Sequence, residues 1–261
     1  ASLGELPNQE AIRKRINRTR KVVNITPAQP LDRASIEIYE NYKNYEDESF
    51  LLSDSGYGDR NRILIFAKGS VRNWINQVDK IFVDGTFKLA PKLFAQIFVI
   101  MAQRGNYVVP ILYALLPNKK EQTYTRMIQM IIESWPTFHP TAISLDFEVA
   151  VINAFSSAFP NASLQGCLFH LVQNIRRKLV DEGLISRYNK DADFALKTRM
   201  IAALAFVPIE ELERSFGVLS NSLSQEFTPI LDYFEDYYIV RMLLNNVRLQ
   251  PLFNRPFCRV I

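Results

Sequence analysis

The central part of this chain orders its strand-like and helix-like patterns in a way that few folds can accommodate. Three runs rich in β-branched and aromatic residues come first, at 81–89, 93–101 and 107–116, separated by short gaps that contain Pro or Gly. Gaps of this kind favour antiparallel hairpins. Pro110 lies inside the third run and would remove a ladder hydrogen bond, so we expect that strand at a sheet edge.

Helices and strands then alternate. Apolar residues at helical spacing end at Pro136, and the strand-like "AISL" (142–145) leads into a second amphipathic helix that closes at Pro160. The strand-like "SLQGCLF" (163–169) leads into a third helix. Strands joined through a helix pair in parallel by right-handed crossovers. The order therefore predicts an α/β fold with a mixed five-stranded sheet, three antiparallel strands and then two parallel ones, flanked by helices.

Shorter elements precede this core. Residues 7–23 predict a polar, basic helix, and "NITPAQP" after it reads as a linker because of its two prolines. Two short strands are expected at 35–40 and 62–67, and one helix at 70–78 with Ser70 as its N-cap.

Beyond Gly183 the pattern is helical only. Helices are expected to start near Asp191, Pro208 and Thr228, where prolines suit first-turn positions. We expect an all-helical insertion or appendage to the sheet.

Composition narrows the function classes. The chain has 261 residues, of which 48% are hydrophobic, so it can build a sizeable core. No apolar run reaches the roughly 18 residues that span a bilayer, and no signal-peptide pattern opens the sequence, which begins with Ala1. Two cysteines are too few for a disulfide framework. We expect a folded protein of a reducing compartment, in the form of a fragment or trimmed chain.

Positive charge gathers in two places, although the net charge is only +4. The first cluster lies in the N-terminal helix and includes Arg13, Lys14, Arg15 and Arg18; the second consists of Arg176, Arg177 and Lys178. Either cluster could contact phosphates, or could simply be a solvated helix face.

Two aspartates follow apolar runs in the same way. Asp84 comes after "IFV" and Asp146 after "AISL". If the first and fourth strands are parallel neighbours, the two carboxylates lie side by side where ligands gather in α/β sheets. Such a pair suits Mg²⁺ or Mn²⁺ and phosphoryl chemistry. The alternative is structural: Asp84 begins a turn with Gly85, and Asp146 caps the next helix.

"GCLFH" places Cys167 and His170 at C-x-x-H spacing. This is half of a zinc site, but only Cys258 and His139 remain as soft ligands, so zinc is not expected. A Cys–His nucleophile and base is a weaker alternative. We favour Cys167 as a small strand residue, with His170 in a first helical turn beside the carboxylates. Glycine-rich phosphate loops and a G-x-S-x-G elbow do not occur.

Three stretches together resemble one family. "VDGTFKLAPKLFAQIFVI", "VPILYALLPNKKEQTYTRMI" and "AISLDFEVAVINAFSSAFPNASLQGCLFHLVQNIRRKL" are similar, in order and spacing, to the transposase domain of Mutator-like elements (MULE), particularly the branch found with FLYWCH zinc fingers. The combination of D-G-T-F, D-x-E-x-A and C-x-x-H-x-x-Q-N-I carries the resemblance, which is close over about residues 80–180.

The resemblance implies an RNase H-like fold with a DDE triad that binds two divalent metal ions, Mg²⁺ or Mn²⁺, and cuts and joins DNA. Asp84 corresponds to the first acid and Asp146 to the second, while Cys167 and His170 form the C-x-x-H signature. The third acid would come from a later helix, where Glu235 is a candidate. We expect the family's own glutamate in a T-N-x-x-E-like stretch beyond Ile261, which would leave this chain with two of three ligands.

The chain accordingly divides into three parts. We expect a basic helix and a small α/β prelude at 1–79, the RNase H-like core at 80–182, and a truncated helical part at 183–261.

The implied function is DNA transposition in the nucleus. Its partners would be transposon ends and target DNA, with a homo-oligomer as the active form and with no membrane and no small-molecule substrate. One alternative is a domesticated or truncated, inactive remnant that binds DNA or protein; another is an RNase H-like nuclease that cuts without joining.

Overall fold

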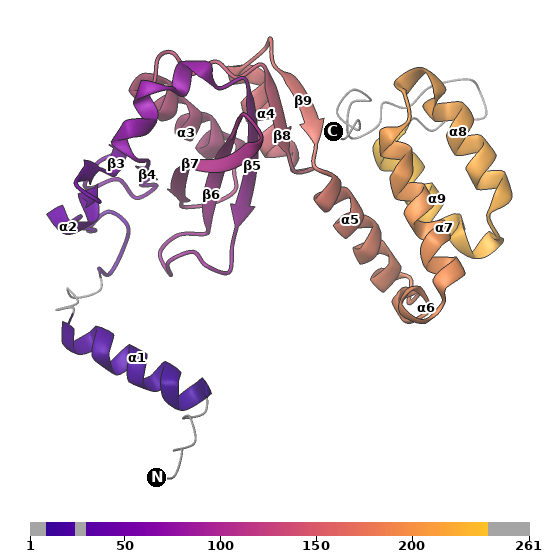
Figure 1. Cartoon of the computed structure of the whole chain (residues 1–261), viewed down its shortest axis with the longest axis horizontal. Coiled ribbons are helices and arrows are strands. Elements are labelled where there is room, and N and C mark those ends of the chain that lie inside the picture. The colour runs from indigo at the N-terminus through magenta and orange to yellow at the C-terminus, as the bar shows by residue number, and fades with distance from the viewer. Residues whose placement is uncertain (1–8, 24–29, 240–261) are drawn as a thin grey trace.

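The computed structural model describes residues 9–23 and 30–239, and its centre is one mixed sheet (Figure 1). The strands of this sheet are, in chain order, β3 (Leu51–Asp54), β4 (Leu64–Phe66), β5 (Lys80–Thr86), β6 (Gln96–Arg104), β7 (Tyr107–Leu116), β8 (Ala142–Leu145) and β9 (Ser163–Gly166). Their spatial order is β3-β4-β7-β6-β5-β8-β9.

The predicted arrangement of the five core strands is confirmed. The strands β7, β6 and β5 are antiparallel neighbours, and β8 and β9 continue the sheet in parallel. The sheet nevertheless has seven strands rather than five, because the β3–β4 hairpin adds to the outer edge of β7.

The third strand, β7, lies at a sheet edge only in its first part, which contains Pro110. Strand β4 pairs with β7 at residues 113–115, so β7 is internal there. Pro110 lies beyond that pairing, next to a register shift in the β6–β7 ladder between Ile100 and Met101. The missing N–H of Pro110 is therefore tolerated where β7 has one strand partner, although the strand as a whole is not an edge.

Two predictions for the prelude are wrong. Residues 35–40 form no strand; the carbonyl oxygen of Ile36 accepts a hydrogen bond from the Arg62 guanidinium (2.6 Å), and β3 takes the edge position instead. The helix expected at 70–78 is two 3₁₀ turns, Gly69–Asn73 and Ile75–Gln77, broken at Trp74, which has φ −137° and ψ 5°. The N-cap of the first turn is Lys68 rather than Ser70.

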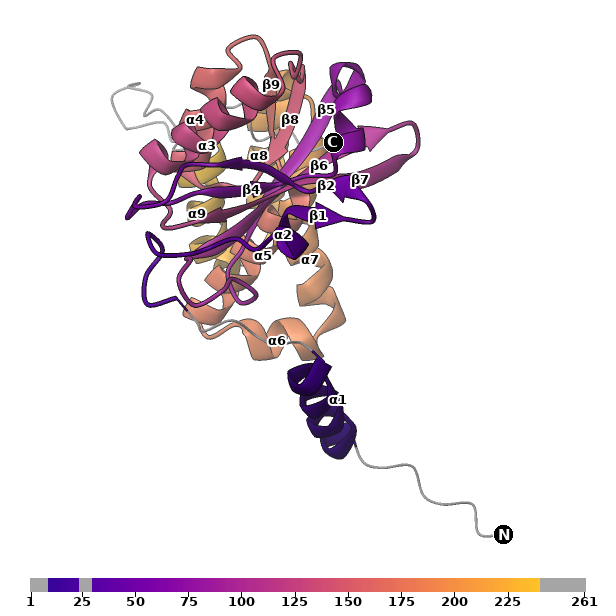
Figure 2. The ribbon, with the colours of Figure 1, turned by 90° about the vertical axis from the view of Figure 1, so that its left-hand side faces the viewer.

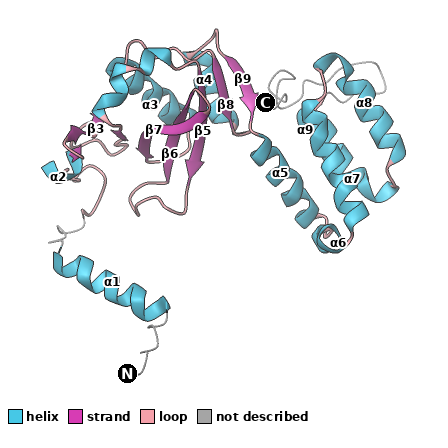
Figure 3. Cartoon of the chain, viewed as in Figure 1, coloured by secondary structure: helices cyan, strands magenta, loops and turns pink. Residues whose placement is uncertain are grey.

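Two helices cover one face of the sheet, α3 (Glu121–Ser134) and α4 (Val149–Ala158) (Figure 3). Along β6, buried residues alternate with half-buried ones, as expected when one face packs against helices. Phe98 on this strand contacts Tyr124 of α3 (ring centroids 5.5 Å apart) and Phe155 of α4 (6.1 Å). The main core therefore lies between β6 and these two helices.

Of the remaining helices, α1, α5, α7, α8 and α9 were predicted, whereas α2 and α6 were not. The basic helix α1 (Gln9–Val23) forms and stands apart from the sheet in both overall views (Figures 1 and 2). Residues 24–29 of the expected linker lie outside the described ranges. A short helix, α2 (Glu40–Lys43), precedes the sheet. Helix α5 (Leu168–Asp181) leads from β9 to the C-terminal helices, which are α6 (Ile185–Lys190), α7 (Ala192–Ala203), α8 (Ile209–Ser222) and α9 (Thr228–Tyr238).

Local chemistry explains where these helices start. The Asp191 carboxylate accepts hydrogen bonds from the N–H groups of Asp193 (3.0 Å) and Phe194 (3.1 Å), so it is the N-cap of α7. Pro208 is the N-cap of α8, and α9 has Pro in its first turn. A small separate hairpin joins β1 (Asn44–Tyr45) to β2 (Glu48–Ser49), and further 3₁₀ turns span Leu204–Phe206 and Gln225–Phe227. None of the helices in the described ranges combines the length and apolar character that a membrane span requires.

Candidate active site

Parallel pairing of β5 with β8 sets Asp84 beside Asp146. The last paired residues of the two strands are Phe82 and Ser144, and each aspartate lies two residues further on. Because side chains alternate along a strand, Asp84 and Asp146 both fall on the face used by Phe82 and Ser144. The negative charge of Asp84 contributes to the raised pKa of Asp146, as expected for two carboxylates at this edge of the sheet.

Neither half of the structural alternative holds as stated. Asp84 does not begin a turn, since Asp84 and Gly85 stay in the ladder opposite Val99 and Phe98. The N-cap of α4 is Glu148 rather than Asp146. Asp146 Oδ1 instead accepts a hydrogen bond from the Glu148 N–H (3.2 Å), and its remaining lone pairs can bind a cation.

His170 is the cation beside Asp84. Cys167 is the N-cap residue of α5 and His170 lies in the first turn, with its Nε2 3.4 Å from Asp84 Oδ1. Hydrogen bonding to Asp84 raises the pKa of His170 to about 10, with Cys167 contributing, against the opposing effect of burial. The same contact lowers the pKa of Asp84. His170 is therefore an imidazolium at neutral pH and holds Asp84 ionised.

The interpretation of Cys167 as a small strand residue is wrong, because β9 ends at Gly166 and Cys167 is the N-cap of α5; the expected place of His170, in the first turn of that helix, is confirmed. The neighbouring His170 lowers the pKa of the Cys167 thiol although burial opposes it. Of the other two soft ligands, His139 lies in the loop before β8, and Cys258 lies outside the described residues.

Asp146 is the less readily ionised of the two aspartates. Burial raises its pKa, and the charge of Asp84 raises it further, while the Glu148 N–H, His170 and Lys119 lower it. Like charges held close together favour a bound cation or a shared proton.

A third carboxylate, Glu148, lies next to this pair, and our sequence analysis did not assign it a role. Its Oε1 accepts a hydrogen bond from the hydroxyl of Tyr124 (3.0 Å), and that hydroxyl accepts one from Gln96 Nε2 (2.8 Å). Gln96 and Tyr124 are both fully buried. Burial raises the pKa of Glu148, and the charge of Asp146 adds to this effect. The sequence signals were the D-x-E spacing at the start of α4 and a glutamine at the head of an apolar strand.

Glu235 lies on α9, which approaches the site through its last turn. Tyr238 on that helix packs edge-on against Phe147, with ring centroids 5.0 Å apart, and Phe147 follows Asp146 directly. The role of Glu235 as third acid remains a prediction.

Two or three acids at this edge of the sheet offer carboxylate oxygens, which are the ligand type that hard divalent cations prefer. As the side chains stand, residues 9–23 and 30–239 contain no group of three His, Cys, Asp or Glu that could hold a metal ion. Asp84 and Asp146 would thus supply two ligands, and water or phosphate oxygens would supply the others.

The two predicted basic clusters occupy separate helices. On α1, Lys14 pairs with Glu10 (2.9 Å), and Arg13, Arg15 and Arg18 are exposed. On α5, which begins at the site, Arg176 is exposed. Its neighbours Arg177 and Lys178 bind Asn174 (3.2 Å) and Glu182 (2.6 Å) respectively. The exposed side chains are accessible to phosphate groups, and their contact with DNA stays a prediction.

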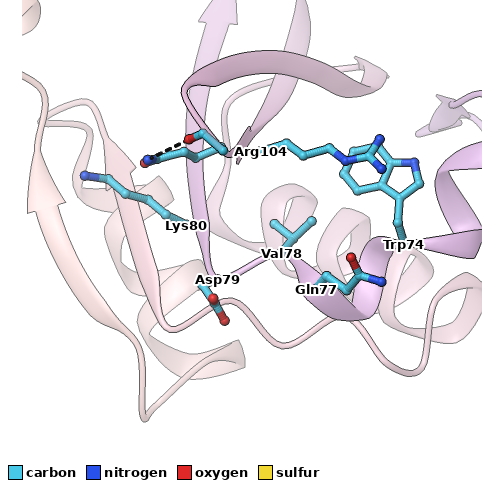
Figure 4. Close-up of a pocket in the computed structure, with 8 residues that line it drawn as sticks. Trp74, Gln77, Val78, Asp79, Lys80 and Arg104 are labelled. Carbon is cyan, nitrogen blue, oxygen red and sulfur yellow. Dashed lines mark hydrogen bonds between the residues drawn. The ribbon is translucent and has the colours of Figure 1, made fainter.

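A polar pocket of about 370 Å³ lies at the other end of β5 (Figure 4). Figure 4 shows the Arg104 side chain over the indole of Trp74, with the guanidinium 4.6 Å from the ring centroid. Lys80 lines this pocket, four residues before Asp84, or about 13 Å along a strand. The pocket is therefore separate from the carboxylate pair.

The family comparison covers the five strands β5 to β9 of the sheet, with α3, α4 and the first half of α5. Residues 80–174 match the family model for the MULE transposase domain. This range includes Asp84, Asp146, Glu148 and the Cys167–His170 pair, and it ends before Arg176 and Glu235. No curated protein matches the chain. Residues 80–174 of this chain thus form a MULE transposase domain, and the carboxylate pair lies inside it.

Proposed function

We propose that this chain acts on DNA as a metal-dependent, DDE-type transposase of a Mutator-like element, with an RNase H-like catalytic core. The observation that carries the proposal is the β5–β8 register, which sets Asp84 beside Asp146 within the matched domain. A transposase domain implies DNA as the partner. Action on transposon ends and genomic target DNA would place the protein in the nucleus, and joining two ends would require a homo-oligomer.

In this proposal Asp84 and Asp146 hold Mg²⁺ or Mn²⁺ at the edge of the sheet. When bound, the ions would activate water, and then a 3′ hydroxyl, for attack on a phosphodiester. His170 keeps Asp84 ionised and oriented through the Nε2 contact. Tyr124 and Gln96 fix Glu148 next to the pair. Glu235 is the proposed third acid.

Nicking of supercoiled plasmid DNA by the full chain, with Mg²⁺ or Mn²⁺, tests the proposal. We expect nicking by the wild type and a loss of at least about 100-fold in Asp84→Asn and Asp146→Asn, since each removes a ligand charge. Asp193→Asn is the matched control, because Asp193 is an exposed acid on α7 that pairs with Lys197 (2.7 Å).

Joining a labelled 3′-hydroxyl oligonucleotide to the plasmid separates the alternatives. Nicking without joining would indicate a nuclease. DNA binding without nicking by the wild type would indicate an inactive binding module, and equal nicking by the wild type and both variants would remove the two aspartates from the chemistry.

A further inference from the structure

Lys119 lies over an aromatic ring at the edge of the carboxylate site. It belongs to the short loop between β7 and α3, and its Nζ is 3.4 Å from the centroid of the Phe87 ring. Both side chains are exposed, Phe87 to 43%. A cation over a ring at an exposed site gains about 0.5–1 kcal/mol, enough to favour one position for a flexible lysine.

The loop that carries Lys119 is fixed on both sides. The backbone carbonyl of Asn118 accepts a hydrogen bond from Nε2 of the buried Gln96 (3.3 Å). The Asn118 side chain accepts bonds from the Lys120 N–H (2.9 Å) and the Thr123 hydroxyl (2.7 Å), which secures the start of α3. The backbone of Lys119 is thus held in place by its neighbours.

Phe87 is also held close to the acids. It follows the end of β5, and its ring folds back over the strand, so that a Cβ added at Gly85 would lie 3.5 Å from Phe87 Cζ. Gly85 is the residue next to Asp84. The ring that supports Lys119 therefore covers the backbone beside the first aspartate.

The charge of Lys119 reaches two of the acids without forming an ion pair with either. It lowers the pKa of Asp146 and of Glu148, in each case against the larger effect of burial. Among the described residues, no carboxylate oxygen lies within 4.0 Å of its ammonium group. The ammonium group rests on the ring and keeps its three donors available to an incoming anion.

We propose that Lys119, supported by Phe87, is a phosphate-binding site for the DNA strand that enters the carboxylate pair. The inference rests on the proposed function and names the contact that this site makes with its substrate. Three neighbouring acids repel a phosphodiester, and a lysine placed beside them offsets that repulsion at the point of approach. The ammonium group would donate to a non-bridging phosphate oxygen.

Binding of the full chain to a fluorescent 30-base-pair duplex, measured by anisotropy without divalent metal at several salt concentrations, tests this site separately from catalysis. We expect Lys119→Met to weaken binding about 5- to 10-fold at low salt. The slope of log affinity against log salt should fall by about 0.9, the value for one lost phosphate contact. Phe87→Leu should weaken binding less, and Phe87→Tyr should not weaken it.

Lys190→Met is the matched control, because Lys190 is an exposed lysine on α6. This control should bind as the wild type does. If Lys119→Met keeps wild-type affinity and slope, the inference is wrong, while nicking that depends on Asp84 would leave the proposed function standing. If Lys119→Met binds DNA as the wild type does but no longer nicks it, the inference is also wrong, because Lys119 then only balances the charge of the acids. Absence of any DNA binding by the wild type would overturn the inference and the proposed function together.

Discussion

Asp84 on β5 and Asp146, directly after the parallel strand β8, each lie two residues past the last pair of the two strands, Phe82 and Ser144. The pairing forces together two carboxylates that would separate in an unfolded chain. Burial and the neighbouring charge raise the pKa of Asp146, so its ionised form costs folding free energy. Sites that hold such groups trade stability for function.

The first prediction is that Asp146→Asn stabilises the metal-free protein. Asparagine keeps the oxygen that accepts from the Glu148 N–H and removes the buried charge. We expect Tm to rise by roughly 2–4 °C, the shift that 1 kcal/mol produces in a chain of this size. Mn²⁺ should raise the Tm of the wild type and leave that of the variant unchanged. Differential scanning calorimetry measures both, and a lower Tm for the metal-free variant would contradict the prediction.

The second prediction concerns the third carboxylate. Glu148 lies beside Asp146 and is fixed by Tyr124, so Glu148→Gln should weaken Mn²⁺ binding about tenfold, a typical loss when a group around a metal site is removed. Glu235→Gln is the comparison on α9; the proposed role of Glu235 as third acid predicts a loss of at least the same size there, and an unchanged affinity would remove Glu235 from that role. Isothermal titration of the full chain with Mn²⁺ measures both. A larger loss in the Glu235 variant would identify Glu235 as the third ligand.

The third prediction is that Gly85 cannot carry a side chain without disturbing the Gln96–Tyr124–Glu148 hydrogen bonds. A Cβ at Gly85 would lie 2.5 Å from Gln96 Oε1, and Gln96 is fully buried. Gly85→Ala should therefore destabilise the protein by about 1–3 kcal/mol.

Urea unfolding measures the stability of Gly85→Ala, and Gly217→Ala is the matched control. A Cβ at Gly217 in helix α8 meets nothing within 4 Å, so this control should gain about 0.5–1 kcal/mol of stability. The double variant Gly85→Ala/Gln96→Ala should be more stable than Gly85→Ala alone, because the shorter side chain at position 96 leaves space for the added Cβ. Equal stability of wild type and Gly85→Ala would show that Gln96 moves aside freely.

The fourth prediction is a pH effect on the β3–β4 hairpin. The Arg62 guanidinium, with a side chain only 4% exposed, binds both oxygens of Asp54 (2.8 and 2.6 Å) and the Ile36 carbonyl oxygen. Burial alone would raise the pKa of Asp54, but Arg62 and the Gly56 N–H bring it below its ordinary value of 3.8. The stability from this pair is therefore fully present above about pH 4 and is lost as pH falls through the lowered pKa.

Asp54→Asn tests this pH effect, because it leaves Arg62 buried without its counter-charge and should cost about 3 kcal/mol at pH 6. The difference from the wild type should shrink towards pH 2. Urea unfolding at several pH values measures it, with Asp193→Asn as an exposed control. A difference that does not change with pH would assign the loss to packing rather than to charge.

Local patterns were sufficient for much of the core. Period-two apolar runs predicted β5 to β7, period 3.6 predicted α3 to α5, and Asp191 signalled the cap of α7. Strand partners were harder to predict. The edge position inferred from Pro110 failed because β4, separated from β7 by about 40 residues of sequence, pairs beside it. Residues 35–40 have strand-like composition, but Arg62 takes their backbone acceptor.

The sequence by itself determined the order of strands and helices, the resemblance to MULE transposases, and the two aspartates, because these depend on residue type and spacing along one segment. Only the tertiary structure decided that Asp84 and Asp146 meet, that His170 pairs with Asp84, and that Glu148 and Lys119 lie beside them. Those contacts join residues up to 86 positions apart, Asp84 and His170, and they depend on strand register and helix docking. Register and docking are set by packing of the whole sheet, which no single segment of the sequence contains.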